Sequence, residues 1–152
     1  MTAPQLTMTE LTQPDAIAES FPLMSALRAR INRETYVAEV ERQRREGYRL
    51  FAARDQGAIV GLIGIRHTHT LSRGEHVFVD DLVTEEARRG TGIGRQMMVW
   101  LAEFTLALSC PLIALDSRDT AKGFYATIGF KFLQSIPCMI TPEFLMQRIT
   151  KT

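Results

Sequence analysis

Between residues 48 and 83 the apolar positions recur mainly every second residue, which is the spacing of β-strands. Residues 48–53 and 58–67 flank an Asp-Gln-Gly turn and are typical of a hairpin. Residues 77–83 are β-branched and apolar, apart from the adjacent carboxylates Asp80 and Asp81. The pattern therefore predicts three antiparallel strands that follow one another along the chain.

Apolar residues outside this segment recur every three or four positions and predict helices. Leu23, Leu27 and Ile31 form one stripe behind Ser20, which is a candidate N-cap. Further helices are predicted at residues 33–46, 93–110 and 120–127. The helix over 93–110 lies between two predicted strands and therefore serves as a crossover connection.

Shorter apolar segments complete the predicted sheet. The candidate strands are residues 5–11, 112–115, 130–133 and 144–149. The segment at 112–115 is wholly apolar and suits the interior of a sheet, parallel to residues 77–83. The sequence thus predicts one α/β (α+β) domain over residues 1–152, with a mixed, largely antiparallel central sheet of six to seven strands flanked by about four helices.

Composition excludes several classes of function. The 152 residues carry a formal net charge of +1, which gives no reason to expect a nucleic-acid partner. The longest apolar runs are too short to span a bilayer, and the first ten residues lack the features of a secretory signal. We therefore expect no membrane association and a cytoplasmic location. Cys110 and Cys138 are then expected to be reduced thiols without a nucleophilic role.

A glycine-rich turn precedes the long predicted helix. It reads Arg89-Gly90-Thr91-Gly92-Ile93-Gly94-Arg95. Such a turn lets backbone N–H groups approach an anion, and the helix N-terminus adds partial positive charge. The Lys-Ser/Thr of the Walker pattern is absent after Gly94, and the glycine spacing differs from the dinucleotide fingerprint. The turn indicates a site for a nucleotide-like anion, although such glycines also permit tight strand–helix packing.

A second motif follows at Ala121, Phe124-Tyr125 and Gly129-Phe130. Arg89-x-x-Gly92-x-Gly94 after a strand resembles motif A of the GCN5-related N-acetyltransferase (GNAT) superfamily, and the second motif resembles its motif B. Residues 79–84 are similar to an uncharacterised bacterial-type branch of this superfamily. The order of predicted elements is also similar to the acyl-CoA N-acyltransferase (GNAT) fold, so the resemblance covers nearly the whole chain.

The resemblance implies acetyl-CoA as the acyl donor. In that family, backbone amides of the turn hold the pyrophosphate of the coenzyme. The matching residues here, expected to have the same role, are Arg89, Gly90, Thr91, Gly92, Ile93, Gly94 and Arg95. The backbone of Leu82, Val83 and Thr84 is expected to pair with the pantetheine arm, as an added strand pairs with a sheet edge. Family members often have an Asn early in motif B. Ser117 or Asp119 stands near that place and is the corresponding candidate for a pantetheine contact.

Direct acetyl transfer needs a neutral amine, a donor to the tetrahedral oxyanion and a proton for the leaving thiolate. Tyr125 stands where the family places its general acid, and its ordinary pKa of about 10 suits donation to a thiolate. Many members carry a Glu base where Phe78 stands here. Asp80 shares a strand face with Phe78 and is the first candidate base, acting directly or through water. Asp81 is the second candidate, and His76 is a minor alternative.

The resemblance thus implies an N-acetyltransferase that moves the acetyl group of acetyl-CoA to a primary amine in a ternary complex. The acidic pair favours a cationic acceptor: a small amine, an amino acid or a lysine side chain. The alternative is a non-catalytic acyl-CoA-binding sensor or regulatory module. The family often dimerises, and the C-terminal strands are the expected surface of a homodimer. We expect no metal, because His67, His69 and His76 have no Cys or carboxylate at ligand spacing on the same element.

Overall fold

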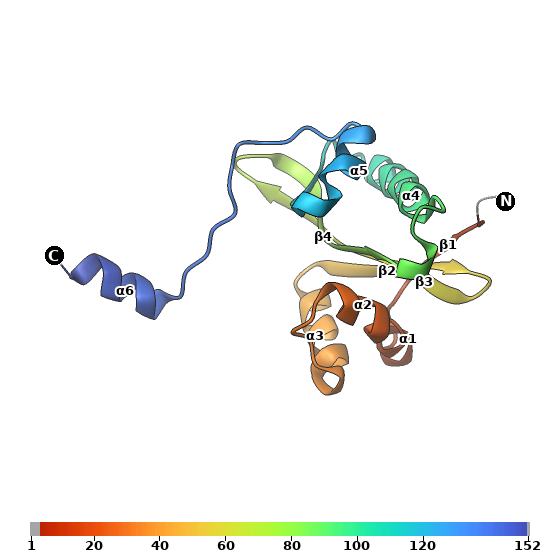
Figure 1. The fold of residues 1–152 in the computed structure, drawn as a ribbon, viewed down its shortest axis with the longest axis horizontal. Helices are drawn as coiled ribbons and strands as arrows, with labels where there is room; N and C mark the ends of the chain where they lie inside the picture. Colours follow the sequence, from red (N-terminus) through yellow and green to blue (C-terminus); the bar gives the residue numbers. More distant parts are fainter. Residues whose placement is uncertain (1–3, 152) are drawn as a thin grey trace. The chain divides into compact units, whose positions relative to one another are not determined.

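The computed structural model describes residues 4–151, which divide into two units (Figure 1). The first unit ends at Asp116 and the second begins at Ser117. The elements of the first unit are β1 (Thr7–Glu10), α1 (Pro14–Glu19), α2 (Phe21–Leu27), α3 (Arg33–Arg45), β2 (Tyr48–Asp55), β3 (Ala58–Thr70), β4 (Gly74–Thr84), the 3₁₀ helix η1 (Glu86–Arg88), α4 (Ile93–Ala107) and β5 (Ile113–Leu115). The second unit contains η2 (Asp119–Ala121), α5 (Lys122–Thr127) and α6 (Pro142–Thr150). The single domain over residues 1–152 stays a prediction.

The sheet belongs to the first unit, and its five strands lie in the order β1-β2-β3-β4-β5. β1 to β4 pair antiparallel, whereas β5 pairs parallel with β4. The predicted hairpin is confirmed, because Gln56 and Gly57 connect β2 to β3 with φ of 49° and 86°, as in the two-residue turns that twisted strands favour. The parallel crossover is also confirmed, because α4 connects β4 to β5.

Helices cover both faces of this sheet, with α1 to α3 on one side and α4 on the other (Figure 1). On the first side, Ile17 of α1 and Leu50 of β2 belong to a buried apolar cluster. On the second side, the ring of Phe51 lies 4.6 Å from that of Trp100, centroid to centroid. Since successive side chains of a strand point to opposite faces, neighbouring residues of β4 face α1 to α3 and α4 in turn.

Two predicted helix boundaries differ in detail. Ser20 lies between α1 and α2, where its hydroxyl donates to the Ile17 carbonyl (2.6 Å) and lies 2.7 Å from the Tyr36 hydroxyl. Ser20 is the N-cap residue of α2, as predicted, but its side chain joins α1 to α3 and makes no capping hydrogen bond to α2. The long helix α4 ends at Ala107 instead of Cys110, because Ser109 turns the chain away with φ of 54°.

The predicted strands at residues 130–133 and 144–149 are wrong, and the sheet has five strands where six to seven are expected. Helix α6 occupies the later segment. Pro142 stands in its first turn, and the Thr141 hydroxyl accepts a hydrogen bond from the Phe144 N–H at 3.3 Å. This proline and cap start a helix, and they outweigh the apolar character that favours a strand. Within residues 4–151 there are six α-helices instead of about four, and none is long and apolar enough to cross a membrane.

Candidate acyl-donor and catalytic site

The glycine turn forms the start of α4. Gly90 and Gly92 have φ of 81° and 89°, a left-handed conformation that favours glycine. Gly92 is the N-cap of α4, and no side chain among residues 4–151 caps this end of the helix. Consequently the N–H groups of residues 92–95 have no acceptor within the described part of the chain, and the first helical bond runs from Gln96 to the Gly92 carbonyl (3.1 Å). Four amide donors and the positive end of a helix dipole suit a phosphate or pyrophosphate group.

The arginines around this turn have different roles. Arg88 forms ion pairs with Asp55, the last residue of β2 before the hairpin turn, and with Glu85 at 3.1 Å. Arg89 and Arg95 are exposed and form no ion pair among residues 4–151. Arg88 therefore fixes the turn to the hairpin, whereas Arg89 and Arg95 are available to bind an anion beside the amide groups.

β4 has an open edge close to the glycine turn. β5 pairs only with residues 77–79 of β4, although β4 continues to Thr84. The Glu85 N–H donates to the Val60 carbonyl of β3, so by alternation Leu82 and Thr84 direct their backbone groups to the edge away from β3. Within the first unit this edge has no neighbouring strand. The open edge allows an extended ligand to pair with the backbone of β4 at Leu82 and Thr84. The backbone groups of Val83, in contrast, are directed to β3.

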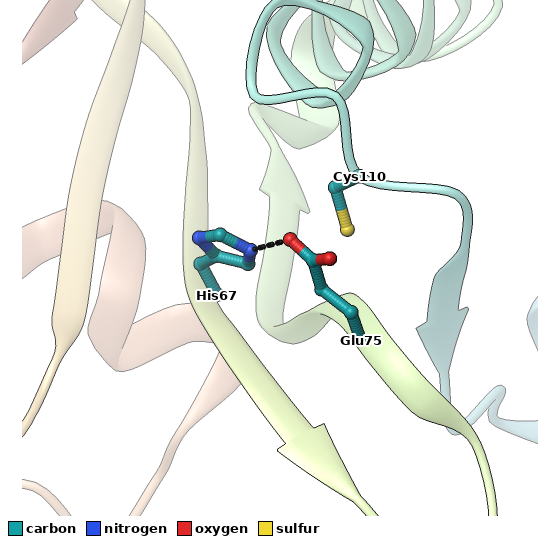
Figure 2. Close-up of side chains that lie close together, drawn as sticks. All are labelled: His67, Glu75 and Cys110. Atoms are coloured by element: carbon teal, nitrogen blue, oxygen red, sulfur yellow. Dashed lines mark hydrogen bonds and ion pairs between the residues drawn. The ribbon is translucent and has the colours of Figure 1, made fainter.

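The candidate histidines occupy opposite faces of the sheet. His76 is 1% exposed, and its Nδ1 lies 2.9 Å from the Gly74 carbonyl, which can only accept, so Nδ1 carries the proton. On the other face, His67 lies beside Glu75 and Cys110 (Figure 2). Ligand spacing along a single strand or helix does not reveal this cluster, because its members come from three separate segments.

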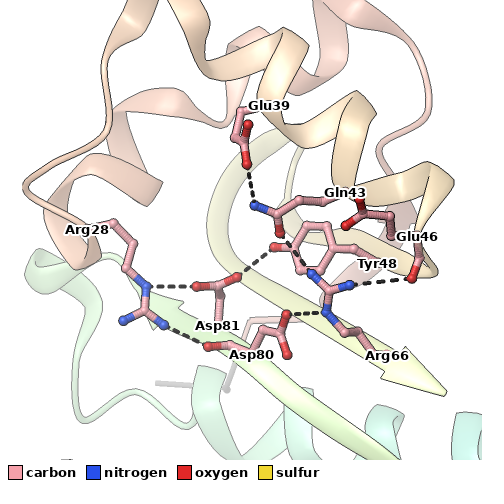
Figure 3. Close-up of polar contacts among 8 residues, drawn as sticks. All are labelled: Arg28, Glu39, Gln43, Glu46, Tyr48, Arg66, Asp80 and Asp81. Atoms are coloured by element: carbon pink, nitrogen blue, oxygen red, sulfur yellow. Dashed lines mark hydrogen bonds and ion pairs between the residues drawn. The ribbon is translucent and has the colours of Figure 1, made fainter. Parts of the chain in front are cut away.

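The two predicted acidic residues are joined in one polar network with two arginines, Arg28 after α2 and Arg66 of β3, and with polar residues of α3 and β2 (Figure 3). Asp80 Oδ2 accepts from Arg66 Nε at 2.6 Å, and Asp81 Oδ1 accepts from Arg28 Nε at 2.8 Å. The second oxygen of Asp81 accepts from the Tyr48 hydroxyl at 2.8 Å, and the Asp80 carbonyl accepts from Arg28. Both carboxylates are therefore balanced by a guanidinium.

A β-bulge places both acids on the same side of the sheet. In the pairing of β3 with β4, Gly64 opposes Asp81 and Ile65 opposes Val79, so Asp80 is the extra residue. Asp80 binds Arg66, which opposes Phe78 in register. This pairing supports the prediction that Asp80 and Phe78 share a face.

The two carboxylates differ in the oxygens that remain available. Asp81 uses both of its oxygens, and its side chain is 15% exposed. Among residues 4–151, Asp80 Oδ1 has no hydrogen-bond partner, and the side chain is 23% exposed. Asp80 thus keeps one oxygen that can take a proton, whereas Asp81 is a structural anchor for Tyr48 and Arg28. Local sequence patterns did not identify these basic partners, because they lie far away along the chain.

Tyr125 and Ser117 belong to the second unit. The Tyr125 ring lies 5.3 Å from both Phe124 and Phe130, centroid to centroid, and the residue is 8% exposed. Burial raises the pKa of Tyr125, so its phenol is protonated at neutral pH. The Ser117 hydroxyl donates to the Arg118 carbonyl at 2.8 Å. The catalytic role of Tyr125 and the pantetheine contact of Ser117 remain predictions.

The fold and the turn define a class of protein: an α+β domain in which a helix start with amide groups free among residues 4–151, suited to an anion, follows a strand with an open edge. A model of the acetyltransferase (GNAT) family matches residues 10–130. The chain belongs to this family, and it is an N-acetyltransferase. Enzymes of this family use acetyl-CoA.

Individual relatives support the same assignment. The chain is 33% identical to the uncharacterised N-acetyltransferase YhdJ of Bacillus subtilis (strain 168), over 81% of this chain and 90% of the relative. It is 26% identical to the glucosamine 6-phosphate N-acetyltransferase of Trypanosoma brucei brucei, over 62% of this chain and 66% of the relative. It also shares the fold of the aminoglycoside N-acetyltransferase AAC(6')-Iy in complex with CoA, with a TM-score of 0.74, 13% identity, and coverage of 93% and 99% of the two chains.

Proposed function

We propose that this protein transfers the acetyl group of acetyl-CoA to a primary amine by direct attack within a ternary complex. The observation that carries the proposal is the start of α4, where the four N–H groups of residues 92–95 lack acceptors within the described residues and the exposed side chains of Arg89 and Arg95 lie in the same turn. A pyrophosphate offers the oxygens that such a group of donors needs. Gly90 and Thr91 complete the loop that approaches it.

The open edge of β4 supports the placement of the pantetheine arm. Leu82 and Thr84 present backbone groups to that edge, so the amides of pantetheine can pair with them as an added strand does. The backbone of Val83, also predicted to pair with this arm, is directed to β3 instead, and its buried side chain helps to hold β4 in place. Ser117 is the candidate for a further side-chain contact.

Two protons move in the proposed reaction, and one residue handles each of them. The amine nitrogen attacks the thioester carbon, the C–S bond breaks, and the thiolate takes a proton from Tyr125 Oη. The new ammonium proton passes to Asp80 Oδ1, directly or through a water molecule. The raised pKa of Tyr125 keeps its proton in place until the thiolate forms. Asp81 supports this arrangement by holding Tyr48 and Arg28.

The pairing of the acids with arginines widens the acceptor class. The acidic pair alone favours a cationic amine, but Arg66 and Arg28 balance both charges. Amines that also carry an anionic group therefore belong in the test beside simple cationic amines. The glucosamine 6-phosphate N-acetyltransferase among the relatives is named for an acceptor of that kind.

The test measures thiol release from acetyl-CoA against a panel of a polyamine, free amino acids, a lysine peptide and glucosamine 6-phosphate. We expect turnover with at least one amine, and we expect Tyr125→Phe to lower kcat by roughly 10²-fold or more while retaining CoA affinity. Tight CoA binding without turnover on any amine would instead support the non-catalytic binding module.

A further inference from the structure

Three side chains able to ligate a metal converge on the α4 side of the sheet (Figure 2). They are His67 of β3, Glu75 of β4 and Cys110, which follows α4. The His67 imidazole, the Glu75 carboxylate and the Cys110 Sγ offer ligand atoms that all lie within 4.8 Å of one another. His67 Nε2 and Glu75 Oε1 are already 2.7 Å apart. The cluster therefore combines nitrogen, oxygen and sulfur donors at one point.

Strand register explains how two of these ligands meet. Glu75 opposes His69, and His67 is two residues from His69, so all three side chains lie on one face of the sheet. His67 and Glu75 are diagonal neighbours on adjacent strands, a separation that their side chains can bridge. The side chain of His67 is 37% exposed and that of Glu75 is 34% exposed, so an ion in solution can reach them.

The end of α4 fixes the third ligand. Ser109 has φ of 54°, its N–H donates to the Leu106 carbonyl, and the Cys110 N–H donates to the Thr105 carbonyl at 3.2 Å. This pair of bonds is a Schellman motif, built here without glycine at the left-handed position. It holds the backbone of Cys110 at the edge of β4, with the thiol 3.7 Å from the Leu112 carbonyl. The cysteine is 5% exposed and points toward the Glu75 carboxylate (Figure 2).

We propose that His67, Glu75 and Cys110 bind one Zn²⁺ ion, with water as the fourth ligand. Zinc accepts imidazole, carboxylate and thiolate together, and in a tetrahedral site these atoms are roughly 3.3–3.8 Å apart. Side-chain rotations that move the ligand atoms by about 1 Å therefore bring them to that spacing. On binding, the S–H bond of Cys110 breaks, its proton passes to buffer, and the sulfur electron pair forms the bond to zinc.

The site is remote from the acetyl-transfer chemistry. Glu75 is at the beginning of β4, and the open edge at Leu82 and Thr84 is at its end. At about 3.4 Å per residue, these ends are roughly 25 Å apart. Zinc there joins the β3–β4 hairpin to the segment that connects α4 with β5. It stabilises the fold and takes no part in the reaction.

The test titrates chelator-treated protein with Zn²⁺ by calorimetry and measures the melting temperature with and without the ion. We expect one ion per chain and a rise in Tm of roughly 5 °C at a hundredfold excess over Kd. Co²⁺ used as a spectroscopic probe should give a sulfur-to-metal charge-transfer band. These readouts do not depend on acetyltransferase activity, so they are separate from the test of the proposed function.

Variants locate the ion. Cys110→Ser and His67→Gln should each weaken Zn²⁺ binding at least about tenfold, and Cys110→Ser should abolish the charge-transfer band. Cys138→Ser is the matched control, because Cys138 is exposed and lies in the second unit. It should leave both properties unchanged. His67→Gln alters an exposed side chain and gives an answer even where Cys110→Ser disturbs the core.

Two results would overturn the proposal. One is wild-type protein that binds no Zn²⁺ at stoichiometric concentration, which would leave His67 and Glu75 as an ion pair alone. The other is Zn²⁺ binding that Cys110→Ser and His67→Gln leave intact and Cys138→Ser removes.

Discussion

The Tyr48 hydroxyl donates a 2.8 Å hydrogen bond to Asp81 Oδ2 across the intervening strand β3. Gly64 makes this possible: it opposes Asp81 in register, and the Tyr48 ring lies in the space above it that a Cβ would fill. Burial and the Asp81 carboxylate raise the pKa of Tyr48, so the phenol acts as a donor throughout the physiological range. A glycine on β3 therefore determines how a residue of β2 reaches the acidic pair.

The first prediction concerns Gly64. Its replacement by Ala should lower the free energy of unfolding by about 1–3 kcal/mol, because the new Cβ would overlap the Tyr48 ring, which is 3% exposed and cannot move away. Gly61→Ala should cost less, since the nearest atom there is the flexible Met97 Sδ at 2.6 Å. Urea denaturation measures both values. Gly123→Ala is the control, because no atom lies within 4 Å of its added Cβ.

The second prediction separates the two carboxylates. Asp80→Asn should lower kcat by roughly 10²-fold, because it removes the candidate base, and should change stability by less than about 1 kcal/mol. Asp81→Asn should cost about 1–3 kcal/mol of stability, because it weakens the bonds to Tyr48 and Arg28. Steady-state kinetics and urea denaturation, applied to both variants, measure the contrast. A larger loss of kcat in Asp81→Asn at unchanged stability would reverse the two assignments.

Local patterns in the sequence predicted most of the first unit correctly. The hairpin at Gln56 and Gly57, the three-strand meander and the crossover through α4 depend on residue periodicity and turn chemistry, which act over a few neighbours. The segment at residues 144–149 was predicted incorrectly, because Pro142 and the Thr141 cap start a helix there. The apolar residues of this segment favour a strand, but the proline and the cap at its start favour a helix.

The candidate site was predictable only in part. The glycine turn is visible in the sequence because its residues are consecutive. The environment of Asp80 is not, because its partner Arg66 is on another strand and the bulge at Asp80 has no local signal. The same holds for Cys110, which meets His67 and Glu75 only when three separate segments fold together. Register and packing, which set these contacts, are properties of the whole sheet.

The third prediction compares two adjacent arginines. Arg89→Gln should raise KM for acetyl-CoA about tenfold with little change in stability, because Arg89 is exposed and unpaired among the described residues. Arg88→Gln should instead lower the free energy of unfolding by about 1 kcal/mol, because Arg88 links Asp55 and Glu85.

Each of these arginine variants is the control for the other. Kinetics and denaturation of both give a crossed pattern, in which affinity follows Arg89 and stability follows Arg88. Equal effects of the two substitutions on KM would show that the charge of the turn as a whole binds the donor, and would contradict the separate roles.

The last prediction concerns the loss of folding stability as the pH falls. Two hydrogen bonds from Arg49, at 2.9 and 2.8 Å, hold the pKa of Glu10 below its ordinary value of 4.5. A carboxyl whose pKa is lower in the folded state contributes stability above its unfolded pKa and loses it as the pH falls through the folded pKa. Because the pair is partly exposed, with 43% of the Arg49 side chain accessible, this contribution is below about 1 kcal/mol.

Glu10→Gln should therefore flatten the decline in the free energy of unfolding between about pH 5 and pH 3, measured by urea denaturation at intervals of pH. Arg49→Gln should flatten the same interval. It should also lower stability at every pH, because the guanidinium lies 5.2 Å from the Phe51 ring centroid and 5.1 Å from that of Phe104. The double variant should show no further flattening, because the two substitutions remove one interaction. An unchanged slope in Glu10→Gln would mean that other carboxylates set the acid limit.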